Sequence, residues 1–399
     1  MRIDYRHITL WLSGILMLLC QACSSDGDSD SNQSDGTSQL EIHVYTPGRP
    51  VVTRADEDYV DPDDPGEMAV NSLDIWVFVS QNATVTNLHR GDLVGHLTPR
   101  VQTTESSFTG TYQMTVSEEF ANERPDVDVY VMANATDNNT GLSLSHEAEP
   151  NDLDNAKIGQ NYFGVANPVM TTPADGLPMS GVLKDMPIGG TDALMTVGNP
   201  LTPVKVVRAV SKVRFLFSRT ETQPIYIKRI TLDGDVIPTQ EYLFLTAPYE
   251  LRSFRIDNSA FESEHALITL SGAEASAIPT CANPSKYAYT GAQSGQAYET
   301  LIQGGIDTGE IGQVGRFYLK ETSTSKKLSG KIYYTVGEND ETEANWKYAN
   351  FSMSGAGDFT RNHTWIVYGY FAGKELIRVS SVDVTDWDEI SGNQEVYNW

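Results

Sequence analysis

The chain has 399 residues, of which 40% are hydrophobic and 20% charged, so it is long enough for two or three domains with sizeable cores. Its net charge of −25 excludes nucleic acid as a partner, because the chain lacks the excess of basic residues that neutralises phosphates. Its three cysteines, two of which lie near the N-terminus, exclude a disulfide framework.

The N-terminal residues predict an export signal. Arg2 and Arg6 precede the apolar run 10–23, which is too short to span a bilayer comfortably. The run ends at Cys23 and a Ser/Asp-rich tether follows, which is typical of a bacterial lipoprotein signal. We therefore expect a signal peptide over residues 1–22 and acylation of Cys23, which would provide a membrane anchor. The alternative is an ordinary secretory signal with an incidental cysteine.

The next segment combines a strand pattern with a polar linker. Residues 39–46, QLEIHVYT, alternate in polarity, which predicts a strand with one buried face. A Pro-Gly turn and two arginines follow, and then the acidic stretch 58–67. This stretch lacks the glycine and the bidentate glutamate of a calcium loop, so it predicts a solvated linker rather than a weak calcium site.

The remaining chain is dominated by short strand-like runs between Gly, Pro, Asn and Asp clusters. These runs are 70–80, 108–116, 126–135, 207–218, 225–234, 265–272, 315–321, 328–336, 362–371 and 376–387. One segment, 145–160, is helix-like but contains Pro150. We predict an all-β fold of antiparallel β-sandwiches. Similar strand patterns recur in the two halves of the chain, which suggests two related units with a boundary near residue 200.

No catalytic chemistry is predicted. The sequence lacks nucleotide-binding, zinc-protease and serine-hydrolase motifs, and its seven histidines do not have helical ligand spacing. We therefore expect no enzyme activity, no metal site and no cofactor. Cys281, the one cysteine outside the N-terminal segment, is expected to be a small apolar filler.

Several stretches in order resemble the fimbrillin family of Bacteroidetes pilins. They are the signal ending at Cys23, 51–55 (VVTRA), 70–78 (VNSLDIWVF), 177–181 (LPMSG), 206–215 (VVRAVSKVRF), 359–371 (FTRNHTWIVYGYF) and 382–387 (VDVTDW). The resemblance implies two tandem transthyretin-like antiparallel β-sandwich domains, over residues 55–205 and 206–399. It also implies an outer-membrane lipoprotein precursor, cleavage by an Arg-specific protease, and polymerisation with other pilin subunits into an adhesive cell-surface fimbrium by strand exchange.

In a fimbrillin, residues 23–54 would be a tether and propeptide that carries a temporary strand. Leu40, Ile42 and Val44 would fill a groove of the N-terminal sandwich, with Tyr45 or Val51 as further candidates. This strand would protect an apolar groove and an unpaired sheet edge during export. The alternative is that residues 39–46 are simply the permanent first strand of the domain.

Cleavage is expected between Arg54 and Ala55. The competing Arg49 precedes Pro50, and proteases rarely cut an Arg-Pro bond because proline lacks the N–H and restricts the chain. If residues 39–46 are never removed, both arginines are ordinary loop charges.

The C-terminal end would supply the donor strand, with Ile377, Val379, Val382 and Val384 as candidate groove-filling residues. The tail 388–399 contains few alternating apolar residues, so its place in the donor is left open. A chain without a donor would be a tip or accessory subunit instead of a stalk subunit.

A second hypothesis is a monomeric surface lipoprotein, or a tip subunit, that binds a glycan or a host protein. Six tryptophans and nineteen tyrosines could provide stacking surfaces. Trp76, Trp346, Trp365 and Trp387 lie in or beside predicted strands, however, which favours core packing for most of them.

Overall fold

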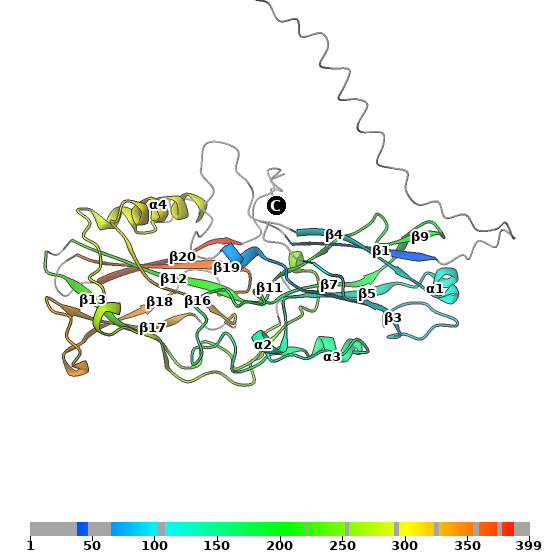
Figure 1. Ribbon diagram of the computed structural model, residues 1–399, viewed down its shortest axis with the longest axis horizontal. Coiled ribbons are helices and arrows are strands. Elements are labelled where there is room, and N and C mark those ends of the chain that lie inside the picture. Colours follow the sequence, from blue (N-terminus) through cyan, green and yellow to red (C-terminus); the bar gives the residue numbers. More distant parts are fainter. Residues whose placement is uncertain are drawn as a thin grey trace, which may run out of the picture. The chain divides into compact units, whose positions relative to one another are not determined.

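The computed structural model describes residues 38–46, 65–101, 108–220, 222–251, 255–290, 295–322, 327–353, 359–372 and 377–386. Within these ranges the chain is built mainly of strands, arranged as two pairs of facing sheets (Figure 1). The all-β, mostly antiparallel sandwich fold is therefore confirmed. No helix in the described ranges is long and apolar enough to cross a membrane.

The first sandwich pairs two five-stranded sheets. One sheet contains β1 (Gln39–Thr46), β4 (Phe108–Thr115), β8 (Ile188–Gly190), β9 (Leu194–Val197) and β10 (Val204–Lys205). The other has the order β11 (Val207–Arg208), β7 (Met179–Met186), β5 (Val127–Ala133), β2 (Leu73–Val79) and β3 (Leu93–Leu97). Apolar side chains from both inner faces form one core between the sheets.

The second sandwich pairs two four-stranded sheets. One has the order β16 (Gly312–Leu319), β12 (Ser211–Arg219), β19 (His363–Phe371) and β20 (Ile377–Asp386). The other has the order β15 (His265–Thr269), β13 (Ile225–Leu232), β17 (Ser329–Val336) and β18 (Lys347–Ser352). β19 lies inside its sheet and is buried on both faces, which explains its near-continuous apolar sequence HTWIVYGYF.

Short helices and turns complete the described chain. The α-helices are α1 (Glu118–Glu123), α2 (Asp137–Thr140), α3 (Pro150–Asp154) and α4 (Gly295–Asp307). The 3₁₀ turns are η2 (Pro65–Met68), η3 (Tyr249–Leu251), η4 (Gly272–Glu274), η5 (Pro284–Tyr287) and η6 (Glu343–Asn345). The helix-like pattern at 145–160 corresponds only to α3, which begins at the proline because proline is compatible with the first helical position.

Two crossing segments connect the sandwiches. The first arm (residues 142–169) belongs to the N-terminal half and the second arm (residues 241–249) to the C-terminal half. Both cover the outer face of the β2–β5–β7 sheet in one apolar cluster, and they pair with each other through β6 (Lys157–Ile158) and β14 (Glu241–Tyr242). The first arm then reaches the other sandwich, where Val165 joins the core. The division into residues 55–205 and 206–399 therefore stays a prediction, since each half contributes to the packing of the other.

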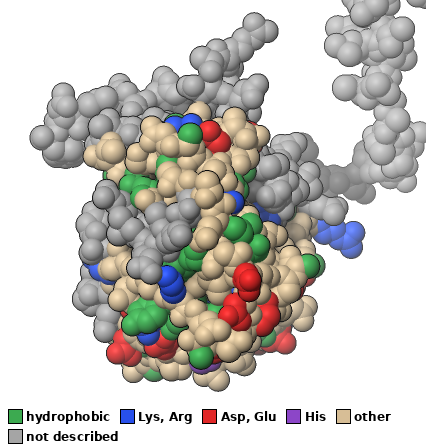
Figure 2. All heavy atoms as spheres, turned by 90° about the vertical axis from the view of Figure 1, so that its left-hand side faces the viewer, with side chains coloured by type: hydrophobic (Ala, Val, Ile, Leu, Met, Phe, Trp, Pro, Cys, Tyr) green, Lys and Arg blue, Asp and Glu red, His purple; other side chains and the backbone are tan. Residues whose placement is uncertain are grey.

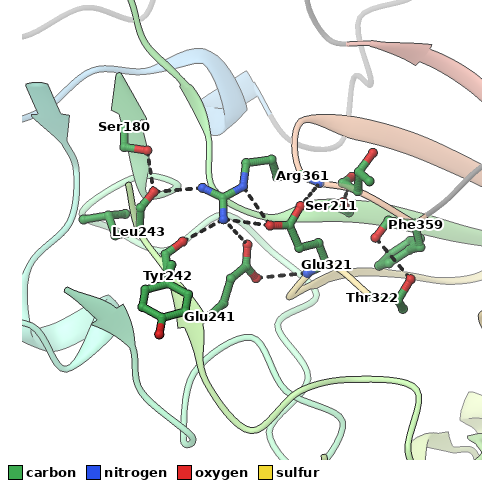
Figure 3. A network of polar contacts seen from close by, with 10 residues as sticks. Ser180, Ser211, Glu241, Tyr242, Leu243, Glu321, Thr322, Phe359 and Arg361 are labelled. Atoms are coloured by element: carbon green, nitrogen blue, oxygen red, sulfur yellow. Dashed lines mark hydrogen bonds and ion pairs between the residues drawn. The ribbon is translucent and has the colours of Figure 1, made fainter. Parts of the chain in front are cut away.

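A buried ionic network lies where the second arm meets both sandwiches (Figure 3). The Arg361 guanidinium contacts Glu241 at 2.9 Å and Glu321 at 2.8 Å, and all three side chains are fully buried. Arg361 also donates to the Leu243 carbonyl, which accepts a second hydrogen bond from Ser180 of β7. Burial and then the neighbouring Glu321 carboxylate raise the pKa of Glu241 well above its usual range.

Candidate functional site

β1 lies in the interior of its sheet, although it is the first strand of the described chain. All eight of its residues pair antiparallel with β4, from Gln39 opposite Thr115 to Thr46 opposite Phe108. On its other side β1 runs parallel to β9 and β10. The strand therefore separates β4 from β9 and β10, and it has no open edge.

One face of β1 is completely buried. Leu40, Ile42 and Val44 have no solvent exposure, and they belong to the core cluster between the two sheets of the first sandwich. Thr46 is also buried and takes the fourth position on this face. Tyr45 lies in the opposite phase of the strand, so it is not part of this buried row.

The outer face of β1 is polar and hydrogen-bonded. Glu41 accepts one hydrogen bond of 2.9 Å from Gln113 of β4, and its carboxylate lies 2.9 Å from Nε2 of His43. These bonds, that of Gln113 first, lower the pKa of Glu41 below its ordinary value. The outer face thus contributes polar pairs, whereas the inner face contributes apolar burial.

Both ends of β1 are fixed by neighbouring backbone groups. At its start, the Gln39 N–H donates to the Ala193 carbonyl at 3.2 Å. At its end, the Val206 N–H donates to the Tyr45 carbonyl at 2.8 Å, and the Phe108 N–H donates to the Thr46 hydroxyl at 3.0 Å. Removal of β1 would leave all these partners without their bonds and would open an apolar slot between β4 and its former neighbours.

The predicted lipidation, cleavage and donor residues are not part of β1. Cys23, Val51, Arg54 and Ala55 lie outside the described residues. The predicted donor positions Ile377, Val379, Val382 and Val384 fall in β20, whose backbone pairs antiparallel with β19 at the edge of the second sandwich. Ile377, Val379 and Val382 are therefore already paired within their own chain, whereas Val384 lies at a register shift between Asp383 and Thr385.

Glu67 corrects the interpretation of residues 58–67 as a wholly solvated linker. Its carboxylate is buried, lies 2.8 Å from the Lys212 amine and accepts a hydrogen bond from Tyr318. Arg208 donates to the Glu67 carbonyl at 3.0 Å. Opposite charge compensates the burial of this carboxylate, and these partners come from strands far away in sequence, which no local pattern reveals. The chain that follows the predicted cleavage loop is thus held at the junction of the sandwiches.

Two of the four tryptophans that were expected to pack in the core are buried there. Trp76 and Trp365 lie in apolar clusters of the two sandwiches. Trp346 is only half-buried, and Trp387 lies outside the described residues. In the described part of the chain, no group of three or more His, Cys, Asp or Glu side chains is arranged to hold a metal ion.

These features define the class of protein: it consists of two all-β sandwiches in tandem, and its first described strand is inserted into the middle of a sheet. The family model described as "Major fimbrial subunit protein (FimA)" matches residues 38–211. The resemblance to the fimbrillin family is thereby confirmed over this part of the chain, which includes every strand of the first sandwich.

Solved structures with low sequence identity also match. The tip fimbrial protein Mfa3 from Porphyromonas gingivalis is 12% identical, with a TM-score of 0.46 over 86% of this chain and 99% of that one. A proposed cell adhesion protein from Parabacteroides distasonis is 13% identical, with a TM-score of 0.49 over 87% and 97%. A fimbrial assembly protein from the same species is 12% identical, with a TM-score of 0.41 over 87% and 95%. Comparison with curated protein sequences finds no match.

Proposed function

We propose that the protein is a subunit of a cell-surface fimbrium, exported as an outer-membrane lipoprotein precursor acylated at Cys23. The family match over residues 38–211 supports the fimbrial role. In this proposal β1 is a temporary strand, and an Arg-specific protease cuts between Arg54 and Ala55. A strand from another subunit then takes the place of β1, which is a form of β-augmentation.

The placement of β1 is the observation that carries the proposal. Its inner face buries three apolar side chains completely, which contributes about 5–9 kcal/mol at about 1.5–3 kcal/mol each. The link between Thr46 and Pro65 contains both Arg49 and Arg54. One cut in this link would separate β1 covalently from the body without breaking any other strand of the described chain.

The buried Glu67 supports the proposal that a cut in this link frees β1 and leaves the rest of the chain in place. Since Glu67 is paired with Lys212 and Tyr318, the chain beyond the cut stays attached to the body. The strand before the cut is held only by non-covalent contacts, so a competing strand can replace it. The released body would also lose the lipid anchor, because Cys23 leaves with β1.

The candidate donor segment in β20 differs from β1 in its pattern of apolar residues and in its pairing. β1 offers four consecutive buried positions on one face, at 40, 42, 44 and 46. In a regular strand, Ile377 and Val379 would face one side and Val382 and Val384 the other, so neither side would present three of these residues. The segment would also have to leave β19 before it could pair with another subunit.

The test compares Arg54→Ala with the matched variant Arg49→Ala in cells that assemble the fimbrium. Arg54→Ala should keep the protein monomeric, lipid-bound and more heat-stable than the cleaved form, whereas Arg49→Ala should be processed normally. N-terminal sequencing of surface material should find Ala55. Assembled fibres whose subunits begin at Cys23 would refute the temporary-strand proposal, and fatty-acid labelling of a Cys23→Ala variant would refute the anchor.

A further inference from the structure

The four sheets of the two sandwiches differ in what lies on their outer faces. The two arms cover the β2–β5–β7 sheet, and α4 covers the β12–β19 sheet with Tyr298 and Ile302. Beside β1, the exposed face of β4 carries threonine and glutamine. The outer face of the β15–β13–β17–β18 sheet, here called the ring face, has no α-helix over it in the described chain (Figure 1). It carries the aromatic rings of Tyr333 and Tyr348.

The ring face is organised by strand register. Thr269, Arg229, Tyr333 and Tyr348 are opposite one another on β15, β13, β17 and β18 and form one row across the sheet. The ring centroids of Tyr333 and Tyr348 are 5.8 Å apart, and Tyr348 is 60% exposed. Beside the β13 position of the row, the centroid of the Trp346 ring lies 5.0 Å from the Arg229 guanidinium. The row therefore offers aromatic surface to solvent at fixed spacing.

The charged groups of this face are paired with one another. Lys331 contacts Glu264 at 3.1 Å, Arg229 contacts Glu343, and the buried amine of Lys228 contacts Glu341 at 2.8 Å. Figure 2, which views the end of the second sandwich, shows hydrophobic side chains next to both acidic and basic ones. With these cations neutralised in a chain of net charge −25, the face is suited to an uncharged partner rather than to an anion.

We propose that the ring face binds a short uncharged oligosaccharide. A pyranose has apolar C–H faces that can stack on tyrosine and tryptophan rings, and hydroxyl groups that can bond to Thr269, Lys331 and Asn350 on the same face. The row crosses the sheet from β15 to β18, which is three strand spacings, so it is about 14 Å long. This length suits a few sugar units, whereas a stable protein partner would need about 800 Å² of contact surface per side. The site does not depend on cleavage or on strand exchange.

The test uses the purified full chain on an immobilised array of galactose-, glucose-, mannose- and N-acetylglucosamine-terminated oligosaccharides, with sialylated and sulfated counterparts. The neutral sugars should bind. Tyr348→Ala should weaken binding about tenfold, whereas Tyr348→Phe, which keeps the ring, should retain most of it. Folding is not at risk, because Tyr348 is largely exposed.

Leu251→Ala is the matched control, because Leu251 is an exposed large apolar residue outside the ring face. It should leave sugar binding unchanged. Binding confined to the sialylated or sulfated sugars, or binding unaffected by Tyr348→Ala, would overturn the proposal. So would a Tyr348→Ala variant that impairs fibre assembly while no sugar binds to the parent protein, since the face would then be a subunit contact.

Discussion

The first and last strands of the described chain are held in opposite ways. β1 is inserted into its sheet, with β4 on one side and β9 and β10 on the other. Among the described strands, β20 lies at a sheet edge and pairs with β19 alone. Loss of β20 would remove an edge strand from its sheet, whereas loss of β1 would split its sheet into two parts. A strand that can be exchanged should therefore leave a slot with two pairing edges, and in this molecule the N-terminal strand meets that condition.

The largest expected effect comes from deleting residues 38–46. The first sandwich should lose about 5–9 kcal/mol, comparable with the total stability of a domain, and should unfold or aggregate. A synthetic QLEIHVYT peptide added in trans should restore the fold, measured by circular dichroism and thermal unfolding. A deletion variant that is as stable as the full chain would show that the slot closes by itself.

Truncation at the other end is the matched experiment. Removal of residues 388–399, or of 377–399, should leave folded monomers that accept a strand but cannot elongate. Electron microscopy of the processed proteins checks this outcome. Fibres of normal length from both truncations would exclude the C-terminal end as the donor.

A slightly smaller effect is expected where the two sandwiches meet. Arg361→Ala should cost about 3–5 kcal/mol, because it leaves Glu241 and Glu321 buried without their cation. Urea unfolding gives the loss. Lys331→Ala, which breaks a more exposed ion pair, should cost about 1 kcal/mol or less. Equal losses in the two variants would mean that water reaches the buried network.

Within β1, replacement of two neighbouring residues should change the stability of the protein by very different amounts. Ile42→Ala should cost about 2–5 kcal/mol, since it creates a cavity in the core of the first sandwich. His43→Ala, one residue later on the outer face, should change stability by about 0.5 kcal/mol or less. Chemical denaturation of the uncleaved precursor measures both. Similar losses would show that the strand is not held by its inner face.

The smallest effect concerns pH. The pKa of Glu41 is lowered in the folded state by its bonds to Gln113 and His43. Ionised Glu41 therefore stabilises docked β1 above its ordinary pKa of 4.5, and this contribution is lost as the pH falls through the lower folded value. Unfolding free energy measured from about pH 2 to pH 6 should fall less steeply toward acid in Glu41→Gln than in the parent protein. Identical slopes would remove Glu41 from the docking contacts.

Most of the long strands were predictable from sequence, because alternation and apolar runs report local burial, but β3, β7 and β18 lie outside the predicted runs. The row at Leu40, Ile42 and Val44 follows from such a pattern, and Thr46 could have been included by continuing the alternation. α4 was missed, although Tyr298, Leu301 and Ile302 have helical spacing. In a β-rich context, this short apolar run gives a weaker signal than the strands around it.

Features that depend on distant partners were not predictable. The burial of Glu67 depends on Lys212 and Tyr318, which lie more than a hundred residues away. The ring face likewise depends on the register between β13 and β17, which are far apart in the chain. A single sequence contains no direct record of such pairings. The acidic, Pro-rich composition of residues 58–67 therefore favoured a solvated linker, and the position of the tryptophans in or beside predicted strands favoured their burial.

The crossing arms also limit how this polypeptide can be divided or recombined. The family match ends at residue 211. Leu243 and Phe244, which pack on the outer face of the first sandwich, come after that residue in the sequence. Val165, encoded before that point, completes the core of the second sandwich. A fragment cut at the sequence boundary would expose apolar surface on either product. Transplanting one half between homologous proteins would therefore require the two arms to be exchanged together with it.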